Sequence, residues 1–189
     1  MSKRRFKRKL WEGGCGFLIL CLLAGFVWAD KVPRVGSTLP KFQLKAPAGK
    51  EDRTYLGVGN TGKFLIQQIP AQILIIEILG VYCPLCQTQG PLFNRLFYQI
   101  QKDPALSKKI RMLAIAAGTN TTEVSYVKQE LQIPFPVLED TDFEVHKLLG
   151  EPKTPTTLIV NKDRKVIFSH VGVIEDINAF YNTIKNLPL

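Results

Sequence analysis

The chain has 189 residues, of which 46% are hydrophobic and 22% are charged, enough apolar material for one globular domain of ordinary size plus an accessory segment. The formal net charge is +9, but residues 1–29 contribute +5 of it and the remaining charges are scattered. A nucleic-acid partner would require basic residues gathered on one face, so this pattern argues against one. Four cysteines are too few for a disulfide scaffold.

Residues 1–29 have the pattern of an export segment. Six Lys and Arg residues precede an apolar run of about fifteen residues, which is shorter than the roughly twenty needed to span a bilayer. This favours a cleaved signal peptide over a membrane anchor retained at residues 11–29. In both cases the segment contacts the membrane, and residues 30–189 lie in the periplasm or another extracytoplasmic space. Cys15 and Cys21 fall in the apolar run and are interpreted as small apolar residues.

Residues 30–71 are interpreted as a lead-in to the main domain, residues 72–189. This part is rich in proline and glycine, and the alternating Phe42 and Leu44 predict a short strand. A further edge element is expected at residues 64–66. The rest of the lead-in is predicted as turns.

The main domain alternates between predicted strands and helices. Residues 73–79 and 110–117 are almost continuously apolar, which is typical of strands buried on both faces. The other elements, in chain order, are a helix after Cys83, a helix beginning near Asn120, a strand at 135–138, a helix at 143–149, a hairpin of strands 156–160 and 166–168, and a closing helix containing Ile177 and Ile184. This order predicts an α/β fold, with a central mixed β-sheet flanked by helices on both faces.

Two cysteines separated by two residues, Cys83 and Cys86, follow the first buried strand and open the next helix. That spacing keeps their sulfur atoms within disulfide reach. Cys83 is placed at the helix N-terminus, where free N–H groups and the helix dipole stabilise a thiolate. Because the thiolate is the nucleophile of disulfide exchange, Cys83 is the predicted attacking residue and Cys86 the resolving residue.

Other uses of this cysteine pair fit the sequence less well. A disulfide closing so short a loop would restrain little of the unfolded chain. A zinc site needs four ligands, and the chain has two histidines and no second pair of this spacing. Haem attachment requires a histidine after Cys86, where Gln87 stands. No metal ligand and no cofactor other than the redox-active Cys83–Cys86 disulfide is therefore expected.

The motif and its surroundings resemble the thioredoxin superfamily over residues 72–186. As in that family, an acid, Glu77, stands six residues before the first cysteine, and Pro91 stands five residues after the second. Thr154 and Pro155 precede a late strand and resemble the family's cis-proline loop. The resemblance implies a thioredoxin-like fold for the catalytic domain, residues 72–189. The lead-in is similar to that of the exported, often membrane-anchored branch, which includes reductases of cytochrome c maturation and relatives on the peroxiredoxin scaffold.

The resemblance also implies roles for individual residues. Glu77 is expected to be a buried proton acceptor for Cys86, and Tyr82, Thr154 and Pro155 are expected to line the substrate groove. The sequence departs from the family at three positions: Tyr82 replaces a tryptophan, Gln89 replaces the glutamate of several cytochrome-maturation reductases, and Gly80 replaces the threonine of peroxiredoxins.

The predicted function is that of a thiol–disulfide oxidoreductase acting on cysteine-containing proteins outside the cytoplasm. A membrane-bound or exported redox partner is expected to restore the cysteine pair. Two alternatives stay open at this point: a peroxiredoxin-like thiol peroxidase, and a copper-handling module of the same fold. The sequence alone leaves the direction of electron flow undecided.

Overall fold

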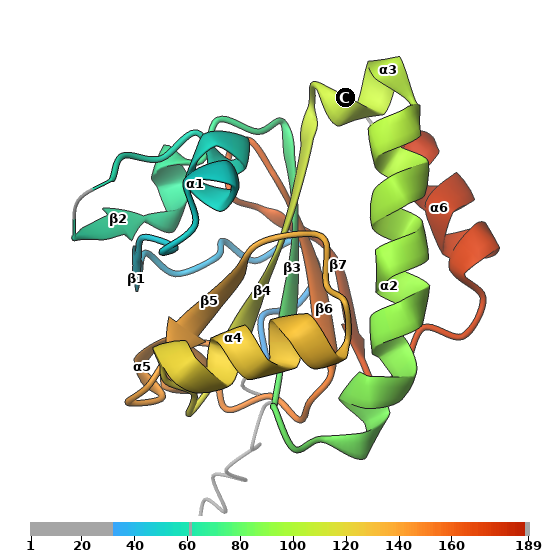
Figure 1. Ribbon diagram of the computed structural model, residues 1–189. Helices are drawn as coiled ribbons and strands as arrows, with labels where there is room; N and C mark the ends of the chain where they lie inside the picture. The colour runs from blue at the N-terminus through green and yellow to red at the C-terminus, as the bar shows by residue number, and fades with distance from the viewer. Residues whose placement is uncertain (1–31, 61, 188–189) are drawn as a thin grey trace, which may run out of the picture.

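The computed structural model describes residues 32–60 and 62–187 (Figure 1). The predicted signal peptide or anchor at residues 1–29 lies outside the described residues. Among the described residues, no helix has the length and apolar character needed to cross a membrane.

A five-stranded mixed sheet forms the centre of the domain, as the sequence predicts. Its strands are β3 (Ile73–Leu79), β4 (Ile110–Ala117), β5 (Val137–Asp140), β6 (Thr156–Asn161) and β7 (Val166–Val171), in the spatial order β5-β4-β3-β6-β7. β3, β4 and β5 run parallel, whereas β6 is antiparallel to both β3 and β7. β3 is central and all seven of its residues are buried, which explains its unbroken apolar run.

Helices and loops cover both faces of this sheet. On one face, α2 (Pro84–Lys102) and α6 (Ile177–Lys185) lie side by side, and α4 (Thr121–Glu130) packs across the β5 end of the sheet (Figure 1). On the other face lie α5 (Glu144–Leu148) and the N-terminal lead-in. Alternate residues of β3 point to the two faces, so Ile73, Ile75, Glu77 and Leu79 face α2.

The lead-in has more regular structure than the sequence predicts. β1 (Gln43–Lys45) and β2 (Lys63–Leu65) pair antiparallel as a separate two-stranded sheet, so the expected edge element is a strand but does not extend the central sheet. Between them lies α1 (Lys50–Leu56), in a part predicted as turns, and η1 (Ile66–Gln68) follows β2. α1 buries only Leu56, so it carries no apolar periodicity that would reveal a helix.

Local sequence signals account for most helix ends. The Asn120 side chain accepts hydrogen bonds from the backbone N–H groups of Thr122 and Glu123, and the Glu123 carboxylate accepts one from the Asn120 N–H, which confirms the expected capping box. A short helix, α3 (Pro104–Ser107), was not expected, although Asp103 caps it. The strand predicted at 135–138 begins two residues later, at Val137.

Candidate active site

Cys83 and Cys86 lie at the start of α2, directly after the loop that leaves β3. Cys83 is the N-cap residue, and Pro84 occupies the first helical position, where a missing N–H costs nothing. The Cys83 Sγ accepts a hydrogen bond from the Cys86 backbone N–H at 3.2 Å. Both cysteines are free thiols, with Cys83 half-buried and Cys86 only 2% exposed. One sulfur of the pair is therefore within reach of a substrate and the other is enclosed.

The two thiols have opposite acidities. Desolvation by partial burial opposes ionisation of Cys83. Hydrogen bonds from the side chains of Cys86 and Thr154 and from the backbone of Cys86 and Leu85 outweigh it and lower the Cys83 pKa. Burial, with the adjoining Cys83, raises the pKa of Cys86 to about 12. The nucleophilic thiolate therefore forms more readily at Cys83 than at Cys86, and Cys86 needs a base before it can react.

The loop before β6, which contains Thr154 and Pro155, also contacts Cys83 Sγ. The Thr154–Pro155 peptide bond is cis, as the family resemblance implies. The Cys83 thiol donates a hydrogen bond to the Thr154 carbonyl at 3.3 Å, so these predicted groove residues do lie beside the cysteine. The Pro155 carbonyl is already occupied, because it accepts a hydrogen bond from the Gly172 N–H at 2.8 Å. Within this loop, Thr154 is thus the residue whose backbone faces the reacting sulfur.

Glu77 is buried in the middle of β3, facing α2. Desolvation raises its pKa to about 7, although a hydrogen bond from Gln89 at 2.9 Å acts in the opposite direction. Gln89 is fully buried, and its carbonyl oxygen also accepts from the Ile174 N–H at 2.9 Å. The sequence identified Gln89 only as a departure from relatives, whereas the structure places it as the link between Glu77 and the loop after β7. The sequence signal that could have revealed this role of Gln89 was its position one helical turn after Cys86, which puts both residues on one face of the helix.

Glu77 is hydrogen-bonded to Gln89, a residue on the same buried face of α2 as Cys86. No hydrogen bond within the described chain joins Glu77 to Cys83 or Cys86. Thr157, the cross-strand neighbour of Glu77, has a buried hydroxyl without a partner in the described chain.

Exposed aromatic side chains stand next to Cys83. Tyr82 is 78% exposed and lines a pocket of about 170 Å³ whose opposite wall includes Tyr126 of α4, itself 56% exposed. Tyr82 was predicted to line a groove, and it does line a concave surface beside Cys83. Tyr126 was missed. The only sequence signal for it was an aromatic residue on the solvent face of a predicted helix.

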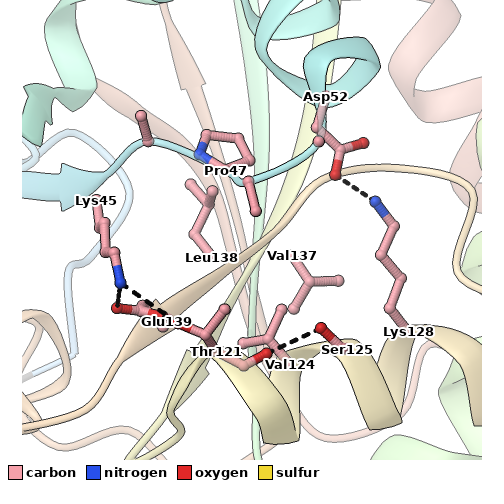
Figure 2. A pocket seen from close by; sticks show the side chains of 13 residues that line it. Lys45, Pro47, Asp52, Thr121, Val124, Ser125, Lys128, Val137, Leu138 and Glu139 are labelled. Carbon is pink, nitrogen blue, oxygen red and sulfur yellow. Dashed lines mark hydrogen bonds and ion pairs between the residues drawn. The ribbon is translucent and has the colours of Figure 1, made fainter. Parts of the chain in front are cut away.

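Another pocket in the described chain lies away from the cysteines (Figure 2). It has a volume of about 340 Å³ and separates the lead-in from α4 and β5. An ion pair between Lys45 and Glu139 stands at one side, and one between Asp52 and Lys128 stands at the other. Because the charged groups around it are paired with one another, we interpret this pocket as part of the seam that attaches the lead-in.

Ligand atoms for a metal ion are not gathered anywhere in residues 32–60 and 62–187. No group of three or more His, Cys, Asp and Glu side chains there comes together.

Known proteins share both the sequence pattern and the fold. A thiol-disulfide oxidoreductase ResA from Geobacillus thermodenitrificans is 26% identical over 168 residues, covering 87% of this chain and 86% of the relative. A second ResA, from Bacillus thuringiensis, is 22% identical over 81% of this chain and 79% of its own length.

Solved structures agree with these relatives at the level of the fold. A putative thiol:disulfide interchange protein DsbE from Chlorobium tepidum has a TM-score of 0.63 and 19% identity, covering 81% of this chain and 96% of that protein. StoA from Bacillus subtilis has a TM-score of 0.57 and 16% identity, covering 76% and 96%. The fold is thus thioredoxin-like. The AhpC/TSA family matches residues 35–169, which include the lead-in, the cysteine pair and the cis-proline loop, and the chain belongs to this family.

Proposed function

We propose that this protein is a thiol–disulfide oxidoreductase that exchanges disulfides with cysteine-containing proteins outside the cytoplasm. One observation carries the proposal: the half-buried Cys83, whose pKa is lowered, lies one helical turn from the buried Cys86, whose pKa is raised. The names of the two ResA relatives support the same reaction. The basic, then apolar N-terminal sequence supports export.

The exchange consists of two displacements at sulfur. The Cys83 thiolate attacks one sulfur of a substrate disulfide, forming a mixed disulfide and releasing the other substrate sulfur as a thiolate, which takes a proton from solvent. Cys86 then gives up its proton and attacks Cys83 Sγ, forming the Cys83–Cys86 disulfide and releasing the second substrate sulfur. Two electrons pass from the protein to the substrate. The same steps in reverse oxidise a substrate dithiol.

Glu77 is proposed as the base for the second displacement. A carboxyl group with a pKa of about 7 is part ionised at neutral pH, which suits proton transfer in both directions. Its contact with Gln89, on the same face of α2 as Cys86, places it on the enclosed side of the cysteine pair. The proton from Cys86 would reach it through one water.

The proposed reaction needs no bound cofactor, because the cysteine pair carries both electrons. It does need a second redox partner, since each turnover leaves the pair in the opposite state. We propose a dithiol or disulfide protein of the membrane or the exported space for this role. The expected contact of residues 1–29 with the membrane would keep the domain near such a partner.

A trapping experiment tests this function. The reduced protein is mixed with a disulfide-bonded peptide, and the products are identified by mass. The wild-type protein is expected to give the Cys83–Cys86 disulfide and peptide dithiol, whereas Cys86→Ser should accumulate a Cys83–peptide mixed disulfide. Cys83→Ser is the matched control and should form no adduct. Equal adduct formation in both variants would contradict the assignment of Cys83 as the attacking thiol.

The peroxidase alternative is tested with the same protein. Gly80, three residues before Cys83, replaces the threonine expected of peroxiredoxins, which argues against peroxide reduction as the main activity. Reaction of reduced protein with a hydroperoxide is expected to be slower than with the peptide disulfide. The opposite order would replace disulfide exchange with peroxide reduction as the main activity.

A further inference from the structure

We propose that the pocket beside Cys83 binds a cationic side chain, arginine or lysine, of the cysteine-containing substrate. This inference rests on the proposed function and specifies the class of substrate that it takes. The pocket has a volume of about 170 Å³ and is formed by the loop before Cys83, the start of α2 and the C-terminal half of α4. Two tyrosines and one carboxylate among its lining residues make the pocket attractive to a cation.

The two aromatic walls come from segments far apart in the sequence. Tyr82 extends from the loop that leads into Cys83, and Tyr126 extends from α4, and both rings are mostly exposed. Two exposed aromatic rings bordering one pocket are unusual for a surface with no ligand, because each leaves apolar area in water. The face of a tyrosine ring attracts a cation, and an arginine plane also stacks on it.

The charge of the pocket is also suited to a cation. Glu130 is its one charged lining residue, so no Lys or Arg lines it in the described chain. Glu123, Tyr126 and Glu130 recur at helical spacing and therefore share one face of α4. The carbonyl end of α4 lies here too and adds a partial negative charge. The basic residue Lys128 on the same helix is paired with Asp52 and does not neutralise this face.

The pocket is held in a fixed place relative to the cysteine. The Asn94 side chain of α2 donates hydrogen bonds to the carbonyls of Leu131, at 2.8 Å, and Gln132, at 3.2 Å, which anchors the end of α4 to α2. The end of α4 lies against the N-terminal half of α2 (Figure 1). Gln87, another lining residue, donates its backbone N–H to the Cys83 carbonyl.

A substrate segment can therefore occupy both sites together. If its cysteine is bonded to Cys83, a long side chain one or two residues away reaches the pocket, since an extended chain advances about 3.3 Å per residue. Thr154, which contacts Cys83 Sγ, is not among the residues that line the pocket, so the two contacts use different residues of the protein. Backbone contacts with Thr154 would not distinguish one substrate side chain from another. The pocket thus adds a preference for substrates with a cationic side chain near the cysteine.

The test compares two disulfide-bonded peptides that differ at one position, two residues from the cysteine, where one has arginine and the other glutamate. The measured quantity is the ratio of their second-order rate constants with the reduced protein. We expect the arginine peptide to react about tenfold faster at low salt, from one exposed cation–π contact and one exposed ion pair. The ratio should fall in about 1 M salt, where charges are screened beyond about 3 Å.

Variants assign the preference to the pocket. Glu130→Gln removes the ion pair and Tyr126→Ala removes a cation–π contact, so each variant is expected to lower the logarithm of the ratio by about half, because the other contact remains. Glu51→Gln, an exposed carboxylate on α1, is the matched control and should keep the wild-type ratio. Because each ratio is measured within one variant, a general change in reactivity cancels.

The outcomes separate this inference from the proposed function. If neither peptide nor a neutral small-molecule disulfide oxidises the cysteine pair, the proposed function is wrong. If both peptides react at the same rate, or if a leucine peptide exceeds the arginine peptide, exchange stands and the cationic pocket is overturned. A tenfold preference that persists in Glu130→Gln also overturns it, because the charge that selects the substrate then lies elsewhere.

Discussion

The buried carboxyl group of Glu77 is expected to make the protein less stable as the pH rises toward neutrality. Burial raises its pKa from the ordinary 4.5 to about 7, despite the hydrogen bond from Gln89. The folded state therefore holds this proton more tightly than the unfolded chain does. The loss of stability begins near pH 4.5, where the unfolded chain releases the proton, and levels off above about pH 7, where the folded protein has also released it.

The size of the effect follows from the shift in pKa. At about 1.4 kcal/mol per pKa unit, a rise from 4.5 to about 7 costs about 3 kcal/mol of unfolding free energy once both states are ionised. Glu77→Gln removes this titration and keeps an oxygen that accepts from the Gln89 amide. Its new NH2 group lies beside the unpartnered Thr157 hydroxyl. We expect the variant to be more stable than the wild-type protein by about 3 kcal/mol at pH 8 and nearly equal to it at pH 4.

Denaturant unfolding of both reduced proteins at pH 4, 6 and 8 measures this difference. Titration of Cys83 contributes to both curves and cancels. Glu144→Gln is the control, because the Glu144 carboxylate is exposed and its removal should change stability little at any pH. A difference between Glu77→Gln and wild type that does not grow with pH would refute the reasoning, since the carboxyl group would then titrate alike in both states. The variant should also form the Cys83–Cys86 disulfide more slowly.

Three further outcomes are expected. Alkylation of the reduced protein near neutral pH should modify Cys83 more than about a hundredfold faster than Cys86, and comparable labelling would contradict the opposite pKa shifts. Gln89→Leu removes both hydrogen bonds of a fully buried amide and should lower the free energy of unfolding by roughly 1–3 kcal/mol in a denaturant melt. The loss of stability caused by Glu77 should then level off at a higher pH, because the hydrogen bond that lowers the Glu77 pKa is gone. Gly118→Ala should lower the melting temperature, because Gly118 has φ +64° and an added Cβ would strike the Phe143 ring, and an unchanged melt would show that the ring moves freely.

The sequence by itself determined the five strands of the central sheet, their order along the chain and the reacting pair. The runs at 73–79 and 110–117 predict central strands because burial on both faces leaves no polar positions. The position of Cys83 at a helix start predicts a thiolate. The helix N-terminus stabilises negative charge on residues of its own first turn, so no distant residue is needed. These features depend on residues close together in the chain, so a local pattern is enough to reveal them.

Only the tertiary structure decided which distant residues meet at the site. The bond between Gln89 and Glu77 requires α2 to cross β3 in one register, and the pocket wall at Tyr126 requires the end of α4 to be anchored on α2 by Asn94. The seven residues of α1 were likewise hidden, because a helix that buries a single side chain leaves no periodic pattern. Such contacts are set by how whole helices pack on the sheet, and helix propensity or hydrophobic period along one segment carries no information about that placement.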